Sequence, residues 1–314
     1  MRRFTPLGML AACLCTCLAA CSPYLYKSEV ESFRAGVNDL ATAYQSGTKG
    51  VAAERAVIQQ TQLTPTRTRV ALSPGCALPA TVSAAPAADN TLPCALQPAD
   101  PAMAPRQSAP RESTSAAPLI HALRDYADAL AAITNAQDQE ALEAANSKLT
   151  GSLAGLASTA KVGLPNEFGA IAGLAFSVGV ATLNQRRFDM LKRGVTAANE
   201  PVAVLGDAMG QALDTLRKAR ADGLLLAGTT MAGQINASMS PDDYTAALTT
   251  LQAKTDAIET LRRTNARAAA DDMVKAHAAL AQALNDDTRQ VAAVVTALKT
   301  FREKARAVQE AFAS

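Results

Sequence analysis

Few side chains in this chain have the chemistry or the spacing of a catalytic site. The two histidines, His121 and His277, lie far apart in the sequence, and His277 has apolar neighbours at helical spacing, which predicts a packed or half-exposed ring. No H-E-x-x-H, G-x-S-x-G or phosphate-binding glycine loop occurs, and the paired aspartates lack the alternating ligands of a calcium loop. A cleft that joins His121 with Asp125 or Asp128 stays open as an alternative. We therefore predict a non-enzymatic protein with no catalytic, metal-binding or cofactor-binding residues.

The first 20 residues have the pattern of an export signal. Met1-Arg2-Arg3 is a short cationic start, and no charged residue follows it up to Cys17, as the core of a secretory signal requires. The stretch from Phe4 to Ala20 has only 17 residues and contains Pro6, whereas a membrane-spanning helix needs about 20 apolar residues. We therefore expect cleavage rather than a permanent span.

The end of this signal carries a specific motif. Leu18-Ala19-Ala20-Cys21 places a branched apolar residue and two small residues before a cysteine. The motif resembles the lipobox of bacterial lipoproteins, in which the cysteine receives diacylglycerol. Leu10-Ala11-Ala12-Cys13 has the same pattern, but its use would leave an apolar core of about six residues, below the usual ~7 to 15. We therefore predict a signal peptide at residues 1–20 and lipidation of Cys21.

The resemblance covers only the signal, and it implies a lipid anchor. Several acyl chains on one cysteine, at about 0.8 kcal/mol per buried methylene, bind a membrane far more firmly than a single myristoyl chain. Ser22 follows Cys21, where this class carries Asp for retention at the inner membrane. The resemblance therefore implies an outer-membrane lipoprotein that faces the periplasm, with inner-membrane anchoring and surface exposure open as alternatives.

Two cysteines remain in the mature chain besides the acylated one. Cys76 and Cys94 are expected to form a disulfide, because such bonds persist in exported proteins. The bond would close a loop of about 19 residues and contribute roughly 3 kcal/mol by the chain-entropy estimate. A metal or redox pair is the alternative, although the sequence has no C-x-x-C spacing and no second pair of ligands.

The charge balance argues against nucleic acid as a partner. Loss of Arg2 and Arg3 with the signal lowers the 30 basic residues to 28, which equals the number of acidic residues, whereas a nucleic-acid binder is expected to show a basic excess. The chain has no Trp and only 4% aromatic residues, which argues against carbohydrate platforms and base-stacking surfaces. The expected partners are the membrane, through the lipid on Cys21, and another envelope protein. The oligomeric state is not predicted.

Proline separates two kinds of segment in the mature chain. Ten of the 15 prolines lie between Pro65 and Pro118, in a stretch that is rich in Ala, Ser and Thr. Proline fixes φ and removes a backbone donor, and few side chains here can be buried. We therefore expect residues 62–117 to form one irregular insertion tied by the cysteine pair. Residues 21–61 would form the anchor and the first helix, and residues 118–314 a helical bundle that the first helix completes.

The other segments show helical periodicity. One stripe follows the anchor, a phase slip at Thr134 to Asp138 predicts a kink or a turn, and capping residues predict helix starts at Asn199-Glu200-Pro201 and Ser240-Pro241. The sequence leaves open whether the chain turns at Asn285-Asp287. The stripes of the first and last helices are Val30, Phe33, Val37, Leu40 and Tyr44, and Val291, Val294, Leu298, Phe301, Ala305, Val308 and Phe312.

These patterns predict an all-α fold. Five or six helices of about 25 to 45 residues would each be about 38 to 68 Å long at 1.5 Å per residue. Short polar connections favour antiparallel neighbours. The predicted architecture is therefore an elongated antiparallel bundle with a Pro-rich, disulfide-tied insertion.

One stretch suggests a second function. Residues 168–183 contain no charge over 16 positions, and small residues recur there at every fourth position. Such a face lets helices pack closely in membranes, and the segment resembles the insertion element of α-helical pore-forming toxins. Burial inside the bundle is the simpler interpretation, because 16 residues reach only about 24 Å. The small residues are Gly169, Gly173, Ser177 and Ala181.

The sequence thus favours a lipid-anchored cell-envelope protein with a structural or protein-binding role, such as a scaffold or docking surface. The alternative is a membrane-active protein of the pore-forming type that uses residues 168–183. Neither the partner nor the pathway can be read from the residues.

Overall fold

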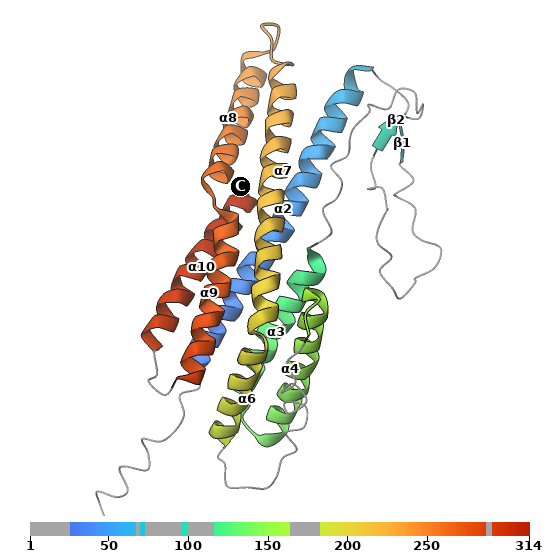
Figure 1. The fold of residues 1–314 in the computed structure, drawn as a ribbon. Coiled ribbons are helices and arrows are strands. Elements are labelled where there is room, and N and C mark those ends of the chain that lie inside the picture. The colour runs from blue at the N-terminus through green and yellow to red at the C-terminus, as the bar shows by residue number, and fades with distance from the viewer. Residues whose placement is uncertain (1–25, 67–69, 73–95, 99–115, 164–182, 287–290) are drawn as a thin grey trace, which may run out of the picture. The chain divides into compact units, whose positions relative to one another are not determined.

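The computed structural model is almost entirely α-helical, which confirms the predicted all-α class (Figure 1). It describes residues 26–66, 70–72, 96–98, 116–163, 183–286 and 291–314, with the backbone alone described at 61–66 and in the two strands. These ranges hold eight helices. They are α2 (Lys27–Thr66), α3 (Ala117–Asn135), α4 (Gln139–Ala160), α6 (Leu183–Ala197), α7 (Asn199–Ala232), α8 (Pro241–Arg263), α9 (Ala266–Asn285) and α10 (Val291–Ala313).

A short antiparallel ladder lies within the stretch predicted to be wholly irregular. Strand β1 (Val70–Leu72) pairs with β2 (Leu96–Pro98), and Leu72 lies opposite Leu96. The strands of such a ladder pair through backbone donors and acceptors. Pairing of this kind does not require alternating apolar and polar side chains, so the sequence pattern did not indicate it. The first helix also reaches Thr66, past the predicted boundary at residue 61. The structure therefore places regular elements within a stretch that was expected to be irregular.

The helices are shorter and more numerous than predicted. Six of the eight described helices have fewer than 25 residues. One missed break separates α8 from α9, where Thr264 has an extended backbone and its N–H donates to the carbonyls of Thr260 and Leu261. A break of two residues hardly disturbs the apolar periodicity, so the sequence pattern did not reveal it.

Several predicted boundaries are confirmed. The phase slip is a turn, because α3 ends at Asn135 and α4 begins at Gln139. Asp138 caps α4: its side chain accepts a hydrogen bond from the N–H of Ala141 at 2.8 Å. Helix α7 begins at Asn199. Helix α8 begins at Pro241, and the N–H of Asp243 donates to Ser240 Oγ at 3.1 Å, as a capping side chain requires.

The chain forms two compact units. The first contains Met1–Ala41, Ala117–Gly210 and Ala268–Ala305, and the second contains Thr42–Ala116, Gln211–Arg267 and Arg306–Ser314. Helices α2, α7, α9 and α10 supply residues to both units. The predicted division of the chain at residues 20, 61 and 117 stays a prediction.

The core of the first unit confirms the predicted apolar stripes. Phe33 of α2 and Phe301 of α10 are fully buried, and their ring centroids lie 6.0 Å apart. Helices α3 and α4 pack side by side, joined by their short turn (Figure 1). Helices α9 and α10 run antiparallel, because Lys304 forms an ion pair with Asp272, which lies 32 residues earlier in the chain.

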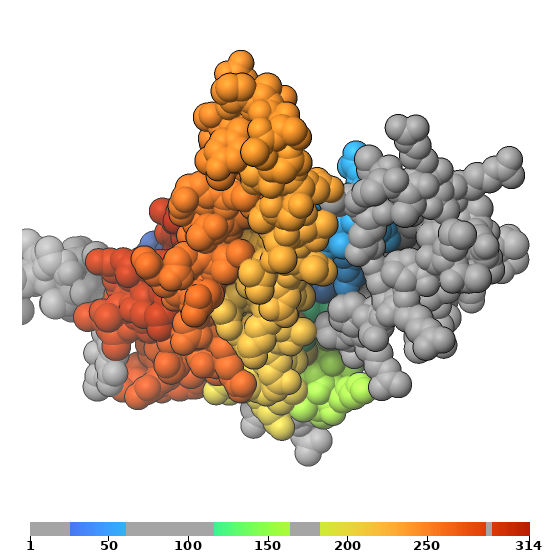
Figure 2. Space-filling view, turned by 90° about the horizontal axis from the view of Figure 1, so that it is seen from above, coloured from blue at the N-terminus to red at the C-terminus, as the bar shows by residue number. Residues whose placement is uncertain are grey.

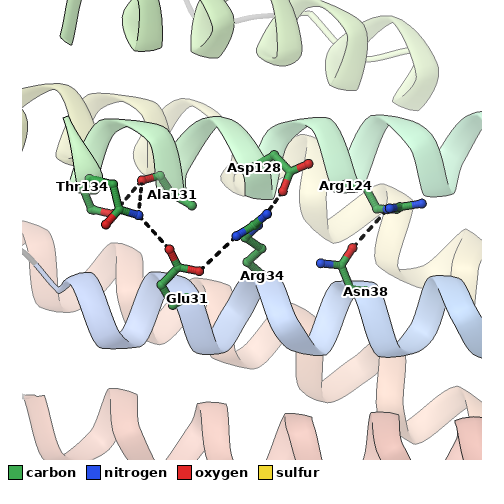
Figure 3. Close-up of polar contacts among 8 residues, drawn as sticks. Glu31, Arg34, Asn38, Arg124, Asp128, Ala131 and Thr134 are labelled. Carbon is green, nitrogen blue, oxygen red and sulfur yellow. Dashed lines mark hydrogen bonds and ion pairs between the residues drawn. The ribbon is translucent and has the colours of Figure 1, made fainter. Parts of the chain in front are cut away.

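Polar contacts join α2 to α3 along the edge of the same unit (Figure 3). Arg34 forms ion pairs with Glu31 and Asp128, and the guanidinium of Arg124 donates to Asn38 Oδ1 at 3.1 Å. These side chains are partly exposed, and such pairs contribute roughly 0 to 1 kcal/mol each. They fix the register of two helices whose apolar faces supply most of the stability.

Candidate interaction surface

Most residues with a predicted functional role lie outside the part of the chain that the structure describes. Cys21, Cys76 and Cys94 are outside the described residues, and so are the small residues Gly169, Gly173, Ser177 and Ala181. Their predicted lipidation, disulfide and close-packing roles therefore stay predictions.

His277 lies inside the core of the first unit, which agrees with the predicted packed ring. Its Nε2 lies 2.8 Å from the hydroxyl of Tyr126, and its Nδ1 lies 3.2 Å from Oδ1 of Asn199. Burial lowers the pKa of His277 to about 3 and raises the pKa of Tyr126 well above its usual value. The imidazole is therefore neutral, donates through Nδ1 and accepts the proton of the phenol. This arrangement links three helices through polar contacts.

His121, the other histidine, lies at the surface rather than in the core. Its side chain is exposed on α3, whereas His277 is buried. Asp128, which the sequence grouped with it, is instead bound to Arg34. Within the described ranges, no group of three His, Cys, Asp or Glu side chains is placed to hold a metal ion.

A buried carboxylate in the first unit also joins two helices. The carboxylate of Asp272 is only 8% exposed and pairs with Lys304 and, at 3.0 Å, with Lys275. Burial alone would raise the pKa of Asp272, but hydrogen bonds from the two ammonium groups outweigh burial and lower the pKa below its usual value. The ionised carboxylate therefore holds α9 to α10.

The hairpin of α7 and α8 in the second unit presents the more unusual surface. Helix α7 faces α2 through two close approaches: a Cβ on Gly50 would lie 1.1 Å from Arg220 Nη1, and a Cβ on Gly223 would lie 3.2 Å from Glu54 Cβ. It faces α8 at Gly228, next to Leu251. These contacts place α2 against one side of α7, and exposed side chains lie on other sides of the hairpin.

Large apolar side chains lie on this uncovered part. Leu225 follows Arg220 and Gly223 by about 140° and 200° around the helix, at 100° per residue, and so points away from α2. It is 60% exposed, Leu226 is 52% exposed, and Tyr244 and Leu248 of α8 are 43% and 45% exposed. Figure 2 shows the end of the hairpin, in orange, at the surface of the molecule.

Charge is depleted along the same part of the hairpin. Between Gly223 and Ala253 the only charged residues are Asp242 and Asp243, which lie in the first turn of α8. An exposed helix of a soluble domain normally carries charge on its outer face. Depletion of charge, together with exposed Leu and Tyr, is instead typical of the centre of a protein interface.

The exposed threonines of the hairpin need no partner for their hydroxyl protons. Each donates to the backbone carbonyl four residues earlier in its own helix, at 2.8 to 3.0 Å. A neighbouring molecule could therefore cover these side chains without leaving a donor unpaired, which otherwise costs about 1–3 kcal/mol per group. They are Thr229, Thr230, Thr245, Thr249 and Thr250. We call the exposed side chains of α7 and α8 between Gly223 and Ala253 the hairpin surface.

The sequence did contain a signal for the hairpin surface. Residues 223–241 form an uncharged run of 19 positions, about as long as the run that begins at residue 168. Polar Thr, Gln, Asn and Ser interrupt the apolar residues of the run at 223–241, so no continuous apolar stretch marks it. The sequence predicted the capped start of α8 at Ser240-Pro241, but not the exposure of its apolar side chains.

Comparison with known proteins gives no relative: no family model, no curated protein and no solved structure matches this chain. Among the described helices, none is long and apolar enough to cross a membrane.

Proposed function

We propose that this chain is a lipid-anchored protein of the bacterial cell envelope that acts as a scaffold and docks another envelope protein on the hairpin surface. The single observation behind the docking role is the exposed part of α7 and α8, which carries large apolar residues and only two charges over 31 positions. The anchor is Cys21, after removal of residues 1–20. Outer-membrane attachment facing the periplasm is part of the proposal.

The architecture that goes with this role is an elongated antiparallel bundle. The insertion at residues 62–117 is tied by a disulfide between Cys76 and Cys94. Long helices offer extended faces for association with other helices, and no enzymatic activity is proposed. The polar residues described in the core, such as His277, hold helices together.

Association has an energetic basis in the exposed side chains. Complete burial of a Leu side chain is worth about 1.5–3 kcal/mol. Leu225, Leu226, Tyr244 and Leu248 are each about half exposed, so covering each contributes on the order of 1 kcal/mol. Large exposed side chains of this kind are the ones in which interface energy is usually concentrated.

The docking role is tested by making the hairpin surface acidic. Leu226→Glu and Leu248→Glu replace exposed residues, so the fold should survive, while a carboxylate in an interface is costly to desolvate. Val295→Glu is the matched control, because Val295 is 49% exposed on α10. We expect co-purification of a defined envelope protein to be lost in the two Leu variants and kept in the control. Equal co-purification by all three variants would refute the docking role of this surface.

The second candidate function is membrane activity through residues 168–183. The supporting observation is the uncharged run with Gly169, Gly173, Ser177 and Ala181 at every fourth position. Such a protein should release dye from liposomes, and Gly173→Glu should abolish the release. A scaffold should leave the dye trapped, so retained dye with the unaltered protein would eliminate this candidate.

A further inference from the structure

An arginine of α7 lies inside the second unit without an acceptor for its protons. Arg220 is only 7% exposed, and its Nε is buried with no hydrogen-bond partner. Within the described part of the chain, no hydrogen bond or ion pair joins its guanidinium to another side chain. Arg217, one turn earlier, donates instead to Asp214 at 2.8 and 3.0 Å and to the carbonyl of Leu261 at 3.2 Å. A buried donor with no acceptor is costly, so Arg220 calls for an acceptor that these helices do not supply.

We propose that Arg220 binds the carboxylate of a small molecule between α2 and α7 in the second unit. The inference goes beyond the docking role and does not depend on it, because the two sites lie on different sides of α7. The guanidinium of Arg220 faces Gly50 of α2, whereas Leu225 of the hairpin surface points away from α2.

Two glycines make room for charged side chains where α2 and α7 approach each other. A Cβ on Gly50 would lie 1.1 Å from Nη1 of Arg220, so the guanidinium occupies the space that a larger residue would fill. A Cβ on Gly223 of α7 would lie 3.2 Å from Cβ of Glu54 on α2. Glycine inside a helix lowers stability relative to alanine. The chain nevertheless has glycine at both places, and the guanidinium is held against the α2 backbone rather than extended into solvent.

The charges beside Arg220 leave room for one more negative charge. Glu54 is 12% exposed, and its carboxylate already accepts a hydrogen bond at 3.0 Å from Lys254, which is 16% exposed. Glu54 raises the pKa of Arg220 through its charge, but burial has the larger effect and lowers this pKa below its usual value. Two cations therefore share one anion, and a single added negative charge restores neutrality.

The chemistry of the site favours a carboxylate over phosphate. A guanidinium presents parallel N–H donors that match the two oxygens of a carboxylate. A carboxylate also carries the one negative charge that balances Arg220, Lys254 and Glu54, whereas a phosphate dianion would leave an excess negative charge. The small exposed fraction of Arg220 limits the ligand to a compact molecule, because the side chain of a folded partner would have to enter between two packed helices.

Thermal unfolding of the full-length, acylated protein with acetate as the probe measures this binding. A ligand that binds only the folded state raises the melting temperature, by about 2–4 °C at roughly ten times its dissociation constant. We expect this rise when sodium acetate replaces sodium chloride at constant ionic strength. Arg220→Gln should lose it. Lys218→Gln should keep it, because Lys218 is 65% exposed on the same helix and binds Asp214 instead.

Two further variants separate a binding role from a structural one. Gly50→Ala keeps every charge but places a methyl group where Nη1 lies, so it should also lose the response to acetate. Arg220→Lys keeps the charge but removes the paired donors, and should raise the acetate concentration needed for half the response at least tenfold. Without acetate, Arg220→Gln should unfold at the same temperature as the unaltered protein or higher, since it removes an unpaired buried cation.

The outcomes that overturn the inference are specific. An equal rise in melting temperature for the unaltered protein, Arg220→Gln and Gly50→Ala would show a general effect of acetate on the protein. A rise with phosphate and none with acetate, at matched ionic strength, would overturn the choice of a carboxylate. No response of the unaltered protein to acetate, together with a lower melting temperature of Arg220→Gln, would show that Arg220 only supports the contact with Glu54.

Discussion

At the scale of single residues, the polar groups inside the first unit act as links between helices. His277 contacts the hydroxyl of Tyr126 on α3 and Asn199 at the start of α7, and its ring also lies 5.6 Å from that of Phe33 on α2. A buried polar side chain is tolerated when both of its polar atoms are paired. His277 meets this condition, so its position is explained by packing without an appeal to catalysis.

The depressed pKa of His277 predicts a specific dependence of stability on pH. Its pKa is about 3 in the folded chain and close to 6.5 when unfolded, so below pH 6.5 the unfolded chain binds the extra proton. The stabilising contribution is complete above pH 6.5 and is lost as the pH falls toward 3, by at most about 1.4 kcal/mol per pH unit.

Chemical denaturation between pH 7.5 and 4.5 measures this effect. His277→Gln removes the titrating group and keeps a polar side chain of similar length. The free energy of unfolding should fall less steeply with decreasing pH in the variant than in the unaltered protein, because other titrating groups are common to both. Identical slopes would show that His277 is not buried in its neutral form.

At the scale of helices, two glycines with opposite surroundings predict opposite effects of the same substitution. A Cβ on Gly36 of α2 would lie 2.4 Å from Cε1 of the buried Phe301, whereas a Cβ on Gly151 of α4 meets nothing within 4 Å. Gly36→Ala should destabilise the protein by about 1–3 kcal/mol, because the ring cannot move without strain. Gly151→Ala should stabilise it by roughly 0.5–1 kcal/mol through helix propensity.

Denaturant midpoints of the two variants measure the difference directly. Both substitutions add the same methyl group inside a helix, so each serves as the control for the other. Equal shifts of the midpoint, or stabilisation by Gly36→Ala, would mean that α2 and α10 do not pack through Phe301 as described.

Apolar periodicity predicts which face of a helix is apolar, but not which elements cover that face. The stripes on α2 and α10 correctly identified buried residues such as Phe33, Leu40, Leu298 and Phe301, because residues three and four apart share a face in any packed helix. Periodicity does not show which elements cover a stripe. The stripe with Tyr244 and Leu248 on α8 looks like the others in sequence but is partly exposed, so the hairpin surface could not be predicted in this way.

At the scale of the whole molecule, the sequence and the structure bear on different parts of the chain. The proposed signal and lipobox fall in residues 1–21, outside the described residues, while the hairpin surface lies within them. The anchor is therefore proposed from a motif alone, and the docking surface from exposure and charge. The irregular insertion was predicted from its prolines, but no side-chain pattern could indicate the β1–β2 ladder inside it.

The lipid anchor predicts a clear difference between two single variants. Cys21→Ser should leave the protein without acyl chains, whereas Cys13→Ser, in the competing motif, should not affect acylation. Intact-mass spectrometry of the mature protein and its partition between membrane and aqueous fractions measure both effects. Loss of acylation in Cys13→Ser, with acylation kept in Cys21→Ser, would move the anchor to the earlier cysteine.

The central claim is that the hairpin surface contacts another protein molecule in the envelope. The most direct test is photo-crosslinking in living cells, with a photoreactive residue at position 248 and a matched one at Val295, which is similarly exposed but lies outside the hairpin surface. The account predicts one recurrent protein adduct from position 248, identified by mass spectrometry, and no such adduct from position 295. Adducts to lipid alone, or the same adducts from both positions, would contradict it.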